Sequence, residues 1–93
     1  MKIIILGAGR VGTTLAEHLC REHDVYLIDK DEKVLKKIGE RLDIQVLAGP
    51  AADPVILESI GADTADMLIA VTCDDETNIF ACQLAYCLFN VPT

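Results

Sequence analysis

The sequence lacks tryptophan, and aromatic residues of all kinds make up only 4% of its 93 residues. Because 52% of the residues are hydrophobic, the core of the folded chain must be aliphatic and modest, as expected of one small domain. The hydrophobic runs are also short. None can span a bilayer, and the first of them, Lys2–Leu6, meets a glycine too early to serve as a signal peptide. We therefore expect one domain over residues 1–93 and no segment inserted in a membrane.

The sequence also lacks any run of basic residues and any closely spaced pair of cysteines. Its formal net charge is -7, which argues against nucleic acid as a partner, because a phosphate backbone needs a basic surface. The four cysteines are Cys20, Cys73, Cys82 and Cys87, and none of them forms a C-x-x-C motif. We expect them to be reduced, mostly buried small hydrophobes of a cytosolic protein, without a metal site.

Glycines are few, six in all, yet three of them stand together in the first turn of the chain. This turn consists of Gly7, Ala8, Gly9, Arg10, Val11 and Gly12, and it follows the apolar strand Lys2–Leu6. In a dinucleotide-binding turn the first glycine permits the bend, the second lets the backbone approach a pyrophosphate, and the third lets the next helix press on the strand. Backbone N–H groups at the helix start then point at the anion. The turn predicts a nucleotide site, with a glycine turn that only packs tightly as the alternative.

Beyond this turn the hydrophobic pattern alternates between strand and helix. We expect strands at 2–6, 25–28, 44–47 and 67–71, and helices over about 11–20, 31–42, 53–61 and 79–89. This alternation predicts an α/β fold, a Rossmann-like doubly wound parallel sheet with strand order 3-2-1-4. The chain stops where the next strand of such a domain would begin. We therefore interpret it as a fragment of a domain that lacks its later strands.

Asp29 closes the second strand, about 20 residues after the glycine turn, where dinucleotide-binding domains place an acid. Its carboxylate can accept both hydrogen bonds from the adenosine ribose diol, and its charge would repel a 2′-phosphate. NAD(H) or an adenine nucleotide is therefore favoured over NADP(H). Lys30 follows at once and could soften that repulsion as part of the site, but a solvated side chain is the favoured interpretation.

Two further segments should border the same crevice. The first and fourth strands flank the point at which the winding of the sheet reverses, so Thr72, Cys73 and Asp74 are expected on its far wall. The acids at 74–76 suit a helix start for purely structural reasons just as well. The small apolar loop that ends at Ala52 suits an adenine ring, although a plain strand-to-helix turn fits nearly as well.

Apolar residues at helical spacing predict the buried face of the first helix. They are Val11, Leu15, Ala16 and Leu19. The two histidines, His18 and His23, lie outside this face and are expected in solvent rather than in a catalytic site.

The next two helices have polar features with structural interpretations. The lysines of the second helix, Lys33, Lys36 and Lys37, are expected on a solvated face rather than on a membrane or RNA surface. Asp31 is expected to cap the start of that helix, and Asp53 the start of the third.

The last expected helix, from Ile79 to Phe89, is apolar nearly all round, with Gln83 the clear exception. Such a helix should be covered on two sides, and it is too short to span a membrane. One face should lie on the sheet and the other on a partner chain or on sequence beyond this chain. We therefore expect a homo-oligomer, a dimer or a ring, formed through this helix.

Four stretches occur together in the chain. They are the first strand with its glycine turn, residues 1–12; Asp29; Gly61-Ala62-Asp63-Thr64-Ala65-Asp66; and Val71-Thr72-Cys73-Asp74-Asp75-Glu76-Thr77-Asn78. Their combination resembles the amino-terminal nucleotide-binding domains of Trk-type potassium-uptake regulatory subunits, in the potassium-transport nucleotide-binding or regulator-of-potassium-conductance family. The resemblance covers essentially the whole chain, and its T-x-D-D-E-T-N stretch is far more specific than the glycine motif.

The resemblance implies a cytoplasmic regulatory protein that binds NAD(H), or ATP and ADP in relatives, and gates a membrane potassium transporter or channel at the inner face of the membrane. Carried over by position, residues 7–11 would hold the diphosphate, Asp29 the ribose and Ala52 the adenine, while Cys73 and Asp74 would line the far wall. Arg10 stands where ATP-binding relatives set a cation against the terminal phosphate.

Ligand-controlled regulation without catalysis is therefore the favoured function. An alternative from a different class is the cofactor-binding half of an NAD-dependent dehydrogenase whose substrate domain lies outside this chain. A third is an assembly module whose glycine turn is vestigial.

Overall fold

The computed structural model describes all residues, 1–93. Along the chain the elements are β1 (Lys2–Leu6), α1 (Arg10–Leu19), β2 (Asp24–Asp29), α2 (Glu32–Arg41), β3 (Gln45–Ala48), α3 (Pro54–Ser59), the 3-10 helix η1 (Ala62–Thr64), β4 (Met67–Ala70) and α4 (Asp75–Phe89). Strands and longer helices alternate as the hydrophobic pattern predicts. The short helix η1 is the one element that the pattern did not indicate.

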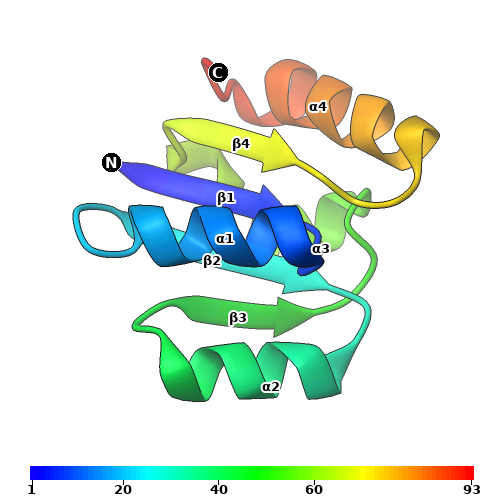
Figure 1. The fold of residues 1–93 in the computed structure, drawn as a ribbon. Coiled ribbons are helices and arrows are strands. Elements are labelled where there is room, and N and C mark those ends of the chain that lie inside the picture. The colour runs from blue at the N-terminus through cyan, green and yellow to red at the C-terminus, as the bar shows by residue number, and fades with distance from the viewer.

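The four strands form one parallel sheet in the order β3-β2-β1-β4 (Figure 1). In the centre of the sheet, Leu6 of β1 is aligned with Ile28 of β2 on one side and with Ala70 of β4 on the other. The chain first builds outward from β1 through β2 and β3, and then returns to the other side of β1 with β4. Open α/β sheets bind ligands at such a reversal. The predicted Rossmann-like fold and strand order are confirmed.

Helices cover both faces of the sheet and bury β1 completely. Helices α1 and α2 pack on the face that carries Ile3 and Ile5, whereas α3, η1 and α4 pack on the face that carries Ile4 and Leu6. These four side chains are at most 2% exposed. A strand buried on both faces needs an apolar run rather than an alternating pattern, which is why β1 consists of β-branched and leucine residues after Lys2.

Most element boundaries differ from the predicted ones by one or two residues, and the start of α4 differs by more. Strand β3 begins at Gln45, one residue later than expected, because its pairing with β2 runs from Tyr26 opposite Gln45 to Asp29 opposite Ala48. Helix α4 begins at Asp75, four residues before the predicted start at Ile79. Its first turn is acidic and carries no apolar pattern, so hydrophobic periodicity could not reveal it.

The four α-helices do not start alike. Asp31, Asp53 and Asp74 cap α2, α3 and α4, and each side chain accepts a hydrogen bond from a backbone N–H of the first turn. This confirms the two predicted caps and shows that Asp74 has a structural role. Helix α1 starts instead at Gly9, with no side-chain cap and no acid in its first turn.

The cysteines differ from the prediction in their exposure. Cys73, Cys82 and Cys87 are exposed and Cys20 is half-buried, although all four are free thiols as expected. Cys73 lies in the loop after β4, and Cys82 and Cys87 lie on the outer side of α4. The inner side of α4 meets the sheet through the small side chains of Ala81 and Ala85 instead.

Two predictions about α1 and the turn after it are also wrong in part. Val11 is 59% exposed rather than buried with Ala16, because it lines the open crevice instead of packing on the sheet. His18 is exposed as expected, whereas His23 is half-buried, with its Nδ1 out of solvent and without a hydrogen-bond partner.

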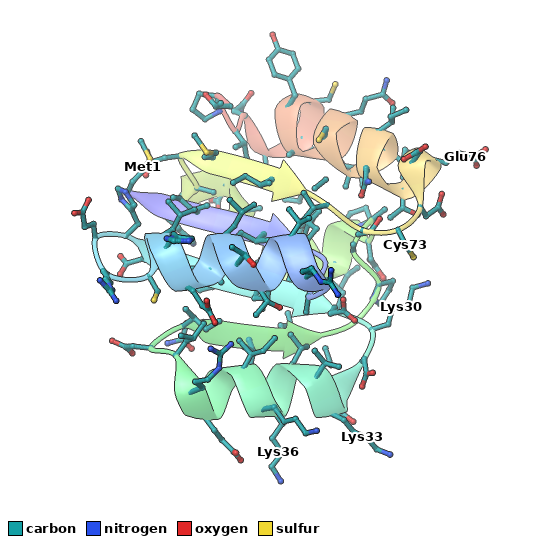
Figure 2. The ribbon with its side chains drawn as sticks, viewed as in Figure 1. Met1, Lys30, Lys33, Lys36, Cys73 and Glu76 are labelled. Atoms are coloured by element: carbon teal, nitrogen blue, oxygen red, sulfur yellow. The ribbon has the colours of Figure 1, made fainter.

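The outer surfaces of α2 and α4 contrast in chemistry. Lys33, Lys36 and Lys37 are exposed as predicted, and Figure 2 shows Lys33 and Lys36 pointing away from the body of the domain. On α4, Ile79 and Tyr86 are 62% and 71% exposed. No helix of the chain combines the length and hydrophobicity needed to cross a membrane.

Candidate functional site

A crevice of about 370 Å³ lies at the carboxyl ends of β1, β2 and β4. It is lined by residues of the glycine turn, of the end of β2, of the loop after β3 and of the loop between β4 and α4. These residues are Gly7, Gly9, Arg10, Val11, Ile28, Asp29, Lys30, Gly49, Ala51, Val71, Thr72, Cys73, Asp74 and Thr77. Figure 2 shows Lys30 and Cys73 at the end of the sheet to which the strands point.

The three glycines of the first turn are required for different reasons. Gly7 has a φ of +110°, and a Cβ there would lie 2.8 Å from the carbonyl oxygen of Val71. A Cβ on Gly12 would lie 1.8 Å from the carbonyl oxygen of Gly7. The fold therefore excludes side chains at Gly7 and Gly12. Gly9 has an ordinary φ of -75°, and a Cβ there would meet no atom within 4 Å. Nothing in the fold explains the glycine at this position, whereas close approach of a ligand to the backbone would.

The start of α1 opens onto the crevice with unused hydrogen-bond donors. The first intrahelical bond at this end runs from the N–H of Thr13 to the carbonyl of Gly9, at 2.9 Å. The N–H groups of Arg10, Val11 and Gly12 find no acceptor within the chain. Donors of this kind, together with the positive end of the helix dipole, form an anion-binding site.

Asp29 ties the glycine turn to the end of β2. Its Oδ2 accepts a hydrogen bond of 2.7 Å from the N–H of Ala8, and its Oδ1 accepts one of 2.9 Å from the N–H of Asp31. A carboxylate has about four acceptor positions, so two remain for hydroxyl groups of a ligand. The same contact means that the N–H of Ala8 is already used and is not available to a phosphate.

The charged groups around the crevice balance one another. Arg10 and Lys30 are exposed and make no ion pair, since the one ion pair of the chain joins Arg41 to Glu17. Against these two cations stand the carboxylates of Asp29 and Asp74. The crevice itself has no net formal charge, so an anionic ligand would depend on the N–H groups of α1 and on the two mobile cations.

The far wall is held by polar side chains that satisfy one another. The Oδ1 of Asp74 accepts from the N–H of Glu76, and its Oδ2 accepts from the hydroxyl of Thr77 at 2.8 Å. The bond from Thr77 is the main reason that the pKa of the Asp74 carboxyl lies below its ordinary value. Desolvation opposes it by raising the pKa, while backbone N–H groups and the Lys30 charge lower it further. Asn78 bonds both the N–H and the carbonyl of Thr72.

All but three of the predicted site residues line the crevice. Ala8 and Gly12 lie beneath it, one with its N–H bonded to Asp29 and the other against the carbonyl of Gly7. Ala52 packs against the core beside α3, and its neighbour Ala51, which is 6% exposed, lines the crevice in its place. The loop thus approaches the expected position, but one residue earlier than predicted.

Sequence reasoning missed several residues of the wall. Gly49 and Thr77 line the crevice, and the N–H of Gly49 donates to the carbonyl of Asp29 at 2.9 Å. That bond fixes the loop after β3 against the end of β2. The T-x-D-D-E-T-N pattern contained the signal for Thr77, because a threonine three residues after an N-cap can reach the capping side chain.

A second hollow, of about 420 Å³, lies against β2 and β3 on the side of α3, and it is larger than the crevice. Tyr26, Gln45, Val46 and Ile60 are among its lining residues, and no charged side chain borders it. A third hollow, on the outer side of α4, is larger still, at about 600 Å³, so size alone would not favour the crevice. We assign the candidate site to the crevice, because only the crevice combines unused donors, charged groups and the switch point of the sheet.

Comparison with known proteins agrees with this assignment of the fold. A family model described as TrkA-N domain matches residues 3–93. Proteins named Trk system potassium uptake protein TrkA from Halomonas elongata and Haemophilus influenzae are 54% and 50% identical to it, each over 100% of this chain. A TrkA homolog 2 from Methanosarcina mazei is 46% identical over 91% of the chain.

The chain spans only about a fifth of the length of these relatives: 21%, 20% and 18%. Among solved structures, the Kef CTD of Shewanella denitrificans in AMP bound form superposes with a TM-score of 0.83 over 97% of this chain and 54% of that chain. At 22% sequence identity this likeness shows the fold alone. The match of the family model over nearly all residues and the high identity of the relatives bear out the resemblance noted in the sequence: the chain belongs to the TrkA-N domain family.

Proposed function

We propose that this chain is the nucleotide-binding regulatory domain of a potassium uptake system. It binds NAD(H), or ATP and ADP, in the crevice at the glycine turn, and its occupancy gates a membrane potassium transporter. The observation that carries the proposal is the start of α1, where Gly9 leaves open space beside the unused backbone N–H groups of Arg10 and Val11. An anion at this position would satisfy those donors and the helix dipole together.

The groups around the crevice support one orientation of an adenine nucleotide. The diphosphate lies over Gly9 at the start of α1, and the ribose hydroxyls bond the free acceptor positions of Asp29. The adenine lies toward Gly49 and Ala51, the small residues of the loop after β3. The volume of about 370 Å³ lies at the lower end of the range of ligand pockets, about 300–1,000 Å³. It suits one nucleotide, so the second half of NAD(H) would extend past the exposed Val11.

Arg10 and Lys30 bear on the choice between the two classes of ligand. Both are unpaired cations beside the crevice. A terminal phosphate of ATP would bring extra negative charge within reach of Arg10, whereas the single diphosphate of NAD(H) needs only the start of α1. Asp29 disfavours a 2′-phosphate in either case. The AMP bound form of the structurally similar Kef CTD supports an adenine nucleotide.

Regulation without catalysis is proposed because the relatives are named as potassium uptake proteins and not as dehydrogenases. In such a system a nucleotide can shift the transporter only by its difference in affinity for two arrangements of the domain, which is typically about 1–3 kcal/mol. The domain would act in the cytoplasm, at the inner face of the membrane, through its transporter partner.

The direct test is calorimetric titration of the purified chain with NADH, NAD, ATP and ADP. We expect at least one of them to bind, and we expect Asp29→Ala to weaken binding by about tenfold to a hundredfold, since a hydrogen bond to a charged group contributes about 1.5–3 kcal/mol. Asp31→Ala is the matched control: it removes the cap of α2 next door but does not line the crevice. Equal affinity in the Asp29 and Asp31 variants, or no binding of any nucleotide, would contradict the proposal.

The exposed thiol of Cys73 provides an independent measure of occupancy. Because Cys73 lines the crevice and Cys82 does not, a bound nucleotide should slow alkylation of Cys73 by iodoacetamide and leave the rate at Cys82 unchanged. Peptide mass spectrometry follows both thiols in one sample. Equal slowing at the two thiols would indicate a general effect on the fold instead of occupancy.

The exposed side of α4 supports the proposed self-association. Ile79, Phe80, Tyr86 and Leu88 are 62%, 51%, 71% and 60% exposed, and exposed apolar side chains that gather on one helix are typical of an interaction surface. We expect Phe80→Asp to shift the chain toward monomer on a sizing column, with Gln83→Asp as the polar control on the same helix. A soluble Phe80→Asp protein that elutes like the parent would exclude a second copy as the occupant of this surface.

A further inference from the structure

One side chain lies between the candidate nucleotide crevice and the outer surface of α4. Asn78 stands in the first turn of α4, where its N–H donates to the carbonyl of Asp74 at 3.0 Å. Asn78 also borders the apolar hollow on the outer side of α4, together with Ile79 and Tyr86. The T-x-D-D-E-T-N stretch ends at this residue, and neither the predicted site nor the proposed function uses it.

The amide of Asn78 makes all three of its side-chain hydrogen bonds to Thr72. The Oδ1 accepts from the N–H of Thr72 at 2.9 Å and from its hydroxyl at 2.6 Å, and the Nδ2 donates to its carbonyl at 3.1 Å. Bonding one residue through both its N–H and its carbonyl imitates the pairing of a neighbouring strand. The amide thereby satisfies the backbone of Thr72 beyond the last residue of β4, where no strand pairs with it.

Thr72 in turn lies against the glycine turn. The preceding residue, Val71, donates its N–H to the carbonyl of Leu6 at 2.9 Å. The carbonyl oxygen of Val71 lies 2.8 Å, and the N of Thr72 3.0 Å, from where a Cβ on Gly7 would be. Thr72 itself lines the crevice. Any ligand that displaces the backbone of Thr72 must therefore move Asn78, or break its bonds.

The remaining contact between α4 and the sheet offers little resistance to a small shift. It consists of Ala81 and Ala85, which present single methyl groups to the sheet, with Leu84 and Phe89 packed beside them. Packing through small side chains fixes the position of a helix along its axis less firmly than interlocking large ones. The bonds between Asn78 and Thr72 are thus the main polar attachment of the α4 start to the sheet.

We infer that Asn78 is a positioning residue that holds Thr72 at the far wall of the crevice and couples nucleotide occupancy to the outer surface of α4. The inference rests on the proposed nucleotide binding. A nucleotide bound beside Thr72 stabilises one position of the first turns of α4. The exposed apolar side chains of α4, from Ile79 onward, move with those turns. Coupling of this kind requires two sites that both shift the position of one structural element. Here the sites are the crevice and the outer surface of α4, and the shared element is α4.

Hydrogen exchange of the α4 amides, measured with and without ADP and NADH in parallel, tests the coupling. In the parent chain a bound nucleotide should slow exchange over residues 75–83 by at least about threefold. In Asn78→Ala we expect affinity to fall on the order of fivefold to tenfold, and the slowing at saturating ligand to disappear. Gln83→Ala, an exposed neighbour on the same helix, should retain both.

A second pair of variants covers the case in which Asn78→Ala unfolds the chain. Thr72→Val removes the hydroxyl bonds to Asn78 and to the backbone of Asp74, and keeps both backbone bonds to Asn78. It should therefore reduce the slowing in part, and Thr72→Ser should restore it fully. A merely structural role would lower the melting temperature without changing the response of α4 to ligand.

The outcomes separate this inference from the proposed function. If no nucleotide binds the parent chain, the proposed function fails and this inference fails with it. If a nucleotide binds and α4 exchange is unchanged, or if it slows equally in Asn78→Ala, the coupling through Asn78 is wrong while nucleotide binding stands.

Discussion

The start of α1 differs from the starts of α2, α3 and α4 in how its first backbone N–H groups are hydrogen-bonded. Every helix begins with backbone N–H groups that have no intrahelical acceptor. Three of the helices supply an acceptor themselves, from Asp31, Asp53 and Asp74. Helix α1 begins at Gly9 and supplies none, although it lies at the centre of the fold beside β1.

The capped helix starts serve the stability of the fold, whereas the uncapped start of α1 is left free for a ligand. Aspartate caps α2, α3 and α4, whereas α1 has no side-chain cap. The start of α1 lies at the switch point of the sheet and borders the open crevice. An aspartate at Gly9 would complete the helix and close the site to an anion. The uncapped helix is thus the feature that an external ligand would complete, and the following predictions test that comparison.

The largest expected effect concerns a glycine that serves folding alone. Gly12→Ala would place a Cβ 1.8 Å from the carbonyl oxygen of Gly7, and a backbone carbonyl cannot yield as a side chain can. We expect a loss of about 3 kcal/mol or more in the free energy of unfolding, measured by urea denaturation. A midpoint equal to that of the parent chain would show that the turn is less tightly packed than described.

The next effect is on binding rather than folding. Gly9→Asp should cap α1 as the other helices are capped, raising the free energy of unfolding by about 0.5 kcal/mol, while lowering nucleotide affinity about a hundredfold through charge and lost donors. Gly9→Asn is the matched variant, because it caps the helix without adding charge. If both variants lost stability and kept their nucleotide affinity, Gly9 would be required for folding and not for ligand binding, which would contradict the account.

A smaller effect is expected at a helix whose cap lies away from the crevice. Asp53→Ala removes the acceptor for the N–H of Val55 and should cost about 1 kcal/mol, with no change in nucleotide affinity. Thermal unfolding and calorimetry on the same sample measure the two quantities. A matching loss of affinity would mean that caps act on the site through general stability.

The smallest effect depends on pH. Because the pKa of Asp74 in the folded chain lies below its ordinary value of 3.8, chiefly through the bond from Thr77, the ionised carboxylate stabilises the fold. That contribution is fully present above about pH 4 and is lost as the pH falls through the folded pKa. It is small, since the carboxyl group is exposed. Carboxyl NMR titration should show the pKa of Asp74 rise toward 3.8 in Thr77→Val, and an unchanged pKa would remove Thr77 as the cause.

The elements and their order followed from the sequence because local and global signals agree here. The apolar run of β1, the glycine turn after it and the caps at Asp31 and Asp53 all indicate alternating strands and helices, and this agreement specifies the fold. Predictions from the sequence were wrong where one pattern fits more than one structure. Val11 matched the spacing of a buried helix face, but periodicity does not reveal that this residue lines the crevice and is exposed.

The wall of the crevice was harder to predict because it depends on loop conformation. Ala51 rather than Ala52 borders the crevice, since the bond from Gly49 to Asp29 fixes the loop after β3. The cysteines of α4 were expected inside because thiols are usually buried. Alanines occupy the inner side instead, and only the position of the helix on the sheet decides which side that is.

The central claim, that the uncapped start of α1 is the anion site, is tested most directly by an amide NMR titration of the chain with ADP. The account predicts that the N–H signals of Gly9, Arg10 and Val11 shift most. Signals from the capped first turn of α4, such as that of Glu76, should shift less, because the ligand affects them only through Asn78. Saturable shifts that spare residues 9–11 and centre on another surface would contradict it.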